Sequence, residues 1–303
     1  MNIDRVIFTP ESGRPDRMEI DQVGNRAPTR QPRPYPSGSA YPYSAETDEF
    51  TGDTLDRSIW SNAWAEDNYL WSVIDGKLKV TMSNGDILGE NTNIKNIFLQ
   101  KAPAGDWHIT TKVTMIPLTA AYTEQAFIIV WQDTNNYVML RATQWTFPDG
   151  GVLPLLHAIS EKKVQTTSYG EIYTVPNTFY LQIRKTCGKY YSFLFSSDGQ
   201  NWQEFGPTFE SDLSDIYVGI GANKGGPVSE NYRAEFDFFS IERQPDLNKD
   251  GTVNFQDLQT IAAEWFSDDC FPKPLGDLDN NCTVDMSDFA EFTLKWLTYS
   301  PCN

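Results

Sequence analysis

The sequence predicts a mainly β protein, in which a jelly-roll sandwich of antiparallel strands is followed by a small α-helical module. From residue 48 to residue 242, short runs that alternate apolar and polar residues are broken by Asn, Asp, Gly and Pro, which is typical of strands joined by hairpins. After residue 244 the apolar residues recur at helical spacing instead, as in Leu258, Ile261 and Trp265. The 303 residues, 40% of them hydrophobic, allow both parts to bury a core.

Eight strands stand out by their alternation of apolar and polar residues. They cover residues 78–82, 107–115, 126–132, 137–143, 179–184, 190–196, 217–222 and 234–242. Turns rich in Asn, Asp and Gly are expected at residues 132–136, 186–189 and 197–202. About a dozen strands in all favour a jelly roll.

Two segments precede the sandwich. Residues 1–25 are too few to fold alone and are interpreted as the remnant of an upstream domain. Residues 26–47 are rich in Pro, Ser and Tyr and lack periodicity, so they are expected to form an extended linker. The sandwich then spans residues 48–243, and the helical module spans residues 244–303.

Acidic residues dominate the charge of the chain. The formal net charge of -17 argues against binding to nucleic acid or to an anionic membrane, because phosphate binding needs an excess of Lys and Arg. No run approaches the roughly 18 apolar residues of a membrane helix, so no membrane insertion is expected. Residues 244–303 hold eleven acidic against three basic residues, and this concentration suggests metal ligands.

The acidic tail contains an internal repeat. The segment DLNKDGTVNFQDLQTIAAEWF (246–266) aligns with DLDNNCTVDMSDFAEFTLKWL (277–297) at an offset of 31 residues. Oxygen-bearing side chains recur at positions 1, 3, 5, 7 and 12 of an EF-hand-type loop, a spacing that suits calcium. Two calcium ions are therefore expected, although Cys282 replaces the glycine of position 6 in the second loop. The predicted ligands are Asp246, Asn248, Asp250, Thr252 and Asp257, and then Asp277, Asp279, Asn281, Thr283 and Asp288.

Each loop is followed by one helix, while Pro245 and Pro274 exclude a helix that enters the loop. This duplicated loop-then-helix pattern resembles the two repeats of type I dockerins. The resemblance implies a calcium-dependent module that binds a cohesin-type scaffold domain through loop positions 10 and 11. The residues at those positions here are Phe255, Gln256, Met286 and Ser287. Neither pair is the Ser-Thr-like pair that is frequent in that family.

Three of the four cysteines lie in the acidic tail, and Cys187 stands alone in the sandwich. Their spacing fits no zinc pattern, so a disulfide bond in an oxidising compartment is expected. A Cys270–Cys282 bond is preferred, because antiparallel helices would bring these residues together, and a Cys282–Cys302 bond is the alternative. The protein is expected outside the cell or at its surface, although residues 1–10 lack the pattern of a signal peptide.

Several motifs of the sandwich carry a second resemblance. Among them are DEFTGDTLDRSIW (48–60), APAGDWHITTKV (102–113) and EQAFIIVWQDTNNYVML (124–140). They resemble the concanavalin A-like domain at the C-terminal end of beta-xylosidases and related family-43 glycoside hydrolases. GRPDRMEIDQV (13–23) resembles the closing strand of that family's catalytic propeller. The resemblance implies an upstream catalytic domain that acts on xylan-like polysaccharides.

No catalytic residue is recognised in the chain itself. Glycoside hydrolysis normally needs two carboxyl groups about 5–10 Å apart, and the nearest motif, at Glu235 and Asp237, lacks the third acid of sandwich-type glucanases. Alternation along residues 137–145 instead places aromatic and hydrogen-bonding side chains on one face. The preferred interpretation is that these aromatic residues pack in the sandwich core or against another domain, and a glycan-binding face is the alternative. The predicted carbohydrate-binding residues are Gln125, Trp131, Arg141 and Trp145.

The preferred function is a non-catalytic, carbohydrate-associated region of a secreted polysaccharide-degrading glycoside hydrolase, attached by a dockerin to a cohesin or cell-surface scaffold. Two other functions are retained as hypotheses. One is a stand-alone glycan-binding protein that holds an oligosaccharide or polysaccharide. The other is a β-sandwich glycosidase with an unrecognised pair of carboxylates.

Overall fold

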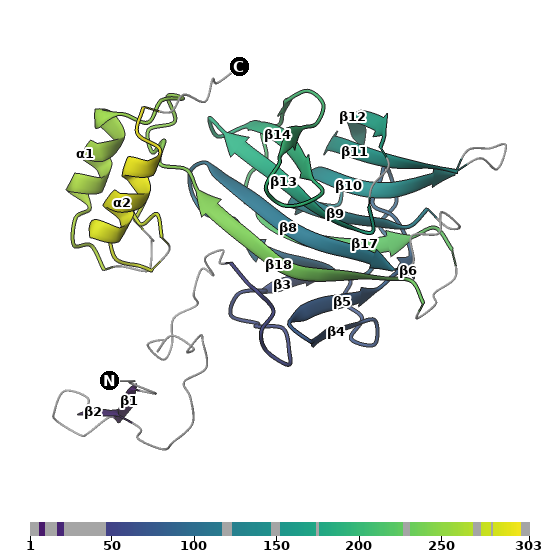
Figure 1. Ribbon diagram of the computed structural model, residues 1–303, viewed down its shortest axis with the longest axis horizontal. Helices are drawn as coiled ribbons and strands as arrows, with labels where there is room; N and C mark the ends of the chain where they lie inside the picture. Colours follow the sequence, from purple (N-terminus) through teal and green to yellow (C-terminus); the bar gives the residue numbers. More distant parts are fainter. Residues whose placement is uncertain are drawn as a thin grey trace. The chain divides into compact units, whose positions relative to one another are not determined.

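A computed structural model of the chain contains two compact units, residues 1–41 and residues 42–303. It describes residues 6–9, 17–20, 47–116, 123–146, 152–173, 176–226, 231–268, 274–279 and 281–297 (Figure 1). In the first unit, strands β1 (Val6–Thr9) and β2 (Arg17–Ile20) form an antiparallel pair. All further elements belong to the second unit.

Two eight-stranded sheets face each other in the second unit (Figure 1). The first sheet has the order β12-β11-β10-β9-β17-β7-β3, and β6 pairs with β17. Its strands are β3 (Asn62–Trp64), β6 (Ser83–Asn84), β7 (Ile97–Lys101), β9 (Gln125–Asp133), β10 (Asn136–Thr146), β11 (Val152–Lys162), β12 (Gln165–Ile172) and β17 (Tyr217–Lys224).

The second sheet has the order β15-β14-β13-β8-β18-β5-β4, and β16 pairs with β14. Its strands are β4 (Trp71–Ile74), β5 (Lys77–Thr81), β8 (Trp107–Ile116), β13 (Thr178–Thr186), β14 (Tyr190–Ser196), β15 (Gln203–Glu204), β16 (Phe209–Glu210) and β18 (Arg233–Arg243). All eight strands expected from the sequence are present, and the three expected turns join antiparallel neighbours. The mainly β sandwich is therefore confirmed.

The main core fills the space between the sheets. Along β8, buried and half-buried residues alternate, so Ile109, Val113 and Met115 point inward. Strand β9 is instead buried on both faces over most of its length. Its outer side chains, including Phe127 and Ile129, belong to a second apolar cluster on the outer face of the first sheet. That cluster is completed by Ile87 and Ile94, from the segment 85–96.

Two short helices follow the sandwich, α1 (Phe255–Ala263) and α2 (Met286–Leu294) (Figure 1). Each begins with a capping box, in which the residue before the helix and the third helical residue satisfy each other's backbone N–H groups. Ile261, Val284 and Phe292 form the centre of a small separate core. Within the described part of the chain, neither helix is long and apolar enough to cross a membrane.

Candidate functional site

The first acidic loop is closed by its last predicted ligand. Asp257 is fully buried, and its carboxylate accepts the backbone N–H groups of Leu247 at 2.7 Å, Asn248 at 3.1 Å and Asn254 at 2.9 Å. The second loop repeats this arrangement, in which Asp288 accepts from Leu278, Asp279 and Asp285. The sequence repeat is therefore also a repeat of structure.

The first predicted ligand of each loop binds the turn from the inside. Asp246 accepts the N–H groups of Asp250 and Gly251, and Asp277 accepts those of Asn281 and Cys282, at 2.9–3.1 Å. The other predicted ligands lie on the same two turns: Asn248, Asp250 and Thr252 in the first, and Asp279, Asn281 and Thr283 in the second.

In the second loop, three carboxylates converge. Oxygen atoms of Asp277, Asp279 and Asp288 all lie within 4.8 Å of one another, and Asp277 and Asp288 are buried. Burial and the neighbouring Asp288 carboxylate raise the pKa of Asp279. Because like charges at this separation repel, a hard divalent cation among these oxygens would relieve the repulsion. The donor set therefore fits calcium.

Position 6 has the same backbone conformation in both loops. Gly251 has φ +86°, and Cys282 has φ +73°, which is a left-handed conformation that glycine adopts far more easily than other residues. The second loop therefore keeps the turn in spite of its substitution. Cys282 is buried and disulfide-bonded. Cys187 of the sandwich is disulfide-bonded as well, although no other cysteine lies in the sandwich sequence. Cys270 and Cys302, and with them the expected Cys270–Cys282 bond, lie outside the described residues.

The residues at loop positions 10 and 11 lie on the surface. Phe255 is 73% exposed and Met286 is 64% exposed, and Gln256 and Ser287 are exposed beside them. Both large side chains stand at the first position of a helix, so the two repeats present them in equivalent places. These four residues are accessible to a partner.

Three of the four predicted carbohydrate-binding residues lie on the outer face of the first sheet, but they are buried. Gln125, Trp131 and Arg141 are each at most 5% exposed. The ring of Trp131 stacks on Tyr137, with centroids 6.3 Å apart, inside the second apolar cluster. The side chain of Trp145 lies outside the described part. Among the described residues, Trp131 thus contributes to a core, as the preferred interpretation of these aromatic residues expected.

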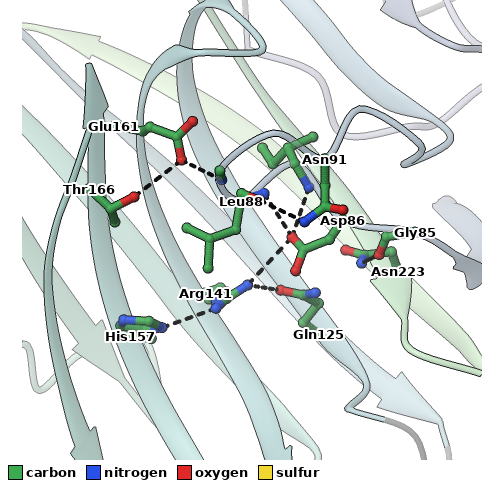
Figure 2. A network of polar contacts seen from close by, with 12 residues as sticks. Gly85, Asp86, Leu88, Asn91, Gln125, Arg141, His157, Glu161, Thr166 and Asn223 are labelled. Atoms are coloured by element: carbon green, nitrogen blue, oxygen red, sulfur yellow. Dashed lines mark hydrogen bonds and ion pairs between the residues drawn. The ribbon is translucent and has the colours of Figure 1, made fainter. Parts of the chain in front are cut away.

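Arg141 is the centre of a buried polar network (Figure 2). Its Nη1 donates to Gln125 Oε1 at 2.5 Å and lies 3.9 Å from a carboxylate oxygen of Asp86, and its Nη2 lies 3.1 Å from His157 Nδ1. Its Nε is buried without a hydrogen-bond partner. Neither His157 nor Asp86 was singled out from the sequence. His157 lies opposite Arg141 on β11, a strand that the sequence analysis did not identify, and Asp86 lies in the segment that covers this face.

The covering segment, residues 85–96, is fastened to the sheet by polar contacts (Figure 2). Glu161 Oε2 accepts hydrogen bonds from the N–H of Gly89 at 2.9 Å and from the hydroxyl of Tyr137 at 3.1 Å. The Asn223 amide donates to the Gly85 carbonyl. Glu161 is fully buried and was not singled out by the sequence. The fastened segment is what excludes solvent from this part of the outer face.

The Glu235 and Asp237 carboxylates are held in salt bridges. Lys77 Nζ lies 2.8 Å from Asp237, Lys112 Nζ lies 2.5 Å from it, and Arg233 Nε lies 2.8 Å from Glu235. Each carboxylate is thus paired with cations on the outer face of the second sheet. Lys77 and Lys112 come from the neighbouring strands β5 and β8, so pairing between strands explains the Asp237 contacts. Arg233, in contrast, lies two residues before Glu235 on β18 itself.

Two histidines are kept neutral by their surroundings. Burial, with the nearby Arg184 and Lys295, lowers the pKa of His108 to about 3. Burial and Arg141 lower the pKa of His157 to about 4. The unfolded chain has ordinary histidines that take up protons near pH 6.5, whereas the folded chain does not. The free energy of unfolding is therefore not reduced by these histidines above about pH 6.5, and it decreases as the pH is lowered toward 4.

We expect each histidine to contribute a loss of about 2 kcal/mol in the free energy of unfolding between pH 7 and pH 4.5. Urea unfolding of the full chain at the two pH values measures this loss. The His108→Gln and His157→Gln variants should each lose correspondingly less than wild type over the same interval. Equal pH dependence in wild type and in both variants would contradict the expectation.

Comparison with known proteins assigns the sandwich to a family. The family model described as "Beta xylosidase C-terminal Concanavalin A-like domain" matches residues 47–242. No curated protein matches the chain. Among solved structures, a xylan beta-1,4-xylosidase from Bacillus halodurans C-125 is 17% identical, with a TM-score of 0.51, over 78% of this chain and 45% of that one.

Two further structures are similar. The GH43 protein BlXynB from Bacillus licheniformis is 20% identical, with a TM-score of 0.53, over 78% of this chain and 46% of that one. The Bacteroides ovatus Xyloglucan PUL GH43B is 16% identical, with a TM-score of 0.52, over 79% of this chain and 46% of that one. At these identities the likeness concerns the fold. The chain spans less than half the length of each of these structures.

Proposed function

Because the chain belongs to the family of beta-xylosidase C-terminal concanavalin A-like domains, we propose that it is the non-catalytic region of a secreted glycoside hydrolase that degrades xylan-like polysaccharides. We propose further that its last sixty residues form a calcium-dependent dockerin that attaches the enzyme to a cohesin-type scaffold. The duplicated carboxylate-closed loop is the observation that carries the second part.

The polysaccharide context is supported by the similar structures. They are described as a xylan beta-1,4-xylosidase and as a protein of a xyloglucan locus, and the chain covers 45–46% of their lengths. The catalytic domain of the proposed enzyme would account for the remainder. The sandwich would then serve as its carbohydrate-associated partner domain.

Calcium binding is supported by the fit of the donors. Three carboxylates in each loop, with Asn248 or Asn281, supply the hard oxygen ligands that calcium prefers. The bound ions would neutralise the repulsion among Asp277, Asp279 and Asp288. The capping boxes connect each loop to its helix, so calcium and helix formation are expected to be coupled.

Docking and secretion rest on other features. Phe255 and Met286 place apolar area on the surface at equivalent positions of the two repeats, as a protein partner would require. The disulfide bonds of Cys187 and Cys282 suit an oxidising compartment. Calorimetric titration of a type I cohesin into the calcium-loaded chain tests the docking step.

Chelation is the test of calcium dependence. In excess chelator, hydrogen exchange should become fast in α1 and α2. Without calcium, the carboxylates within each loop repel one another and no longer hold the loop and its helix in place. The strands β8 and β18 of the sandwich should remain protected. Hydrogen-exchange mass spectrometry of the full chain resolves the two regions, and added calcium should restore the protection of the helices. Helices that are equally protected in chelator and in calcium would contradict the proposal.

A further inference from the structure

The last residue of the sandwich reaches the second acidic loop. Arg243 ends strand β18, and its Nη1 donates to the carbonyl oxygen of Pro274 at 3.3 Å. The same carbonyl accepts the N–H of Asp277, the first residue of the loop, at 3.4 Å. The guanidinium is therefore fixed at the entrance of the loop by a contact that the loop itself shares.

The positive charge of Arg243 is surrounded by acidic groups in and beside this loop and is partly shielded from solvent. Its side chain is partly buried, and its Nε is buried without a hydrogen-bond partner. The acidic groups that act on it are Asp277, Asp288 and Glu264, of which the first two are predicted calcium ligands. Glu264 is itself engaged, since its Oε2 accepts the N–H of Gly276 at 2.6 Å. A charge in such a position is screened less than one on the open surface.

Within the described part of the chain, no arginine contacts the first loop in this way. At the repeat offset of 31 residues, Arg243 corresponds to Pro274 and Glu264 corresponds to Lys295. Lys295 lies 3.2 Å from Glu242. The lysine inside the first loop, Lys249, is exposed. The contact of Arg243 thus breaks the equivalence of two loops whose carboxylate hydrogen bonds are otherwise the same.

We propose that Arg243 acts as a built-in cation at the second loop, which makes the two calcium sites unequal by lowering the calcium affinity of that loop. The inference rests on the proposed calcium binding. A fixed positive charge repels an incoming divalent cation and partly compensates the Asp277 and Asp288 carboxylates before calcium arrives. The sandwich thereby sets the affinity of a site in the module that follows it.

The test compares three forms of the full chain: Arg243→Gln, Arg243→Lys and Lys79→Gln. The second keeps the charge, and the third removes an equal charge from β5, where Lys79 pairs with Asp75. Calcium titration followed by hydrogen-exchange mass spectrometry reads residues 246–257 and 277–288 separately. In Arg243→Gln the midpoint for the second loop should fall about tenfold, while the first loop shifts less than twofold. Arg243→Lys and Lys79→Gln should stay within about threefold of wild type in both loops.

Other results would overturn the inference. If calcium protects both loops of wild type, but Arg243→Gln shifts both midpoints equally or neither, the charge does not act on the second site. Lost protection of residues 277–288 in Arg243→Gln at saturating calcium would show that Arg243 is structural instead. If wild type shows no calcium-dependent protection in either loop, the proposed calcium binding itself fails, and this inference fails with it.

Discussion

Replacing Asp288 by alanine is expected to lower the free energy of unfolding of the helical module by about 3–5 kcal/mol. The carboxylate is fully buried and accepts three backbone N–H groups, those of Leu278, Asp279 and Asp285. Alanine leaves these donors without an acceptor, at a cost of about 1–3 kcal/mol for each one that stays buried. It also removes one half of the capping box of α2.

Two measurements on the full chain check this expectation. Scanning calorimetry should show that the transition of the module moves to lower temperature, and hydrogen exchange in residues 286–294 should become faster. Glu291→Ala is the matched control, because it removes an exposed carboxylate from the same helix, and its effect should stay within about 0.5 kcal/mol. Amides of α2 that remain as protected in Asp288→Ala as in wild type would contradict the role given to this side chain.

The parts of the fold that could be predicted from the sequence are those with a local burial pattern. Strand β8 alternates buried and half-buried residues along its whole length, and it was found with only one residue of difference. Strand β12 was missed because all eight of its residues are exposed, so it has no apolar period to detect. Strand β11 was missed as well; it contains Pro154, which is rare inside strands.

The candidate sites, like the strands, could be predicted only where the pattern is local in the sequence. The acidic loops were visible because their ligands lie within a dozen residues and recur at a fixed offset. Burial of the aromatic residues on this face was the preferred interpretation, but the segment that covers Arg141 and Trp131 could not be identified, because it is distant in sequence. Glu161 and Gly89, which fasten that segment, are separated by 72 positions. Alternation predicts which residues share a face of a sheet, but it carries no information on what covers that face.

The contact of Arg243 with Pro274 illustrates a related limit. Arg243 ends a strand, and in the sequence it is one more polar residue before a domain boundary. Its contact with Pro274 joins residues 31 positions apart, so no local pattern in the sequence could indicate it. The repeat alone suggests two equivalent sites. The difference between them arises from Arg243 of the sandwich, which contacts the entrance of the second loop.

Gly219→Ala is expected to destabilise the sandwich by at least about 3 kcal/mol. Gly219 lies in β17 between β7 and β9, and a Cβ atom there would stand 1.9 Å from the carbonyl oxygen of Phe98. Because the obstacle is backbone, it can yield only if the paired strands move apart. Gly170→Ala, in β12 of the same sheet, is the matched control, since its Cβ would meet only side chains at 3.4 Å or more.

Urea unfolding followed by tryptophan fluorescence measures both glycine variants, because Trp60 and Trp107 are fully buried in the sandwich. Gly170→Ala should stay within about 1 kcal/mol of wild type, since the small gain from a less flexible unfolded chain offsets any crowding. The contrast isolates the close approach of β17 to β7 from the general effect of adding a methyl group. If the two variants unfold at the same urea concentration, the strands are not packed as closely as the Gly219 contact requires, and the second apolar cluster over this part of the sheet is looser too.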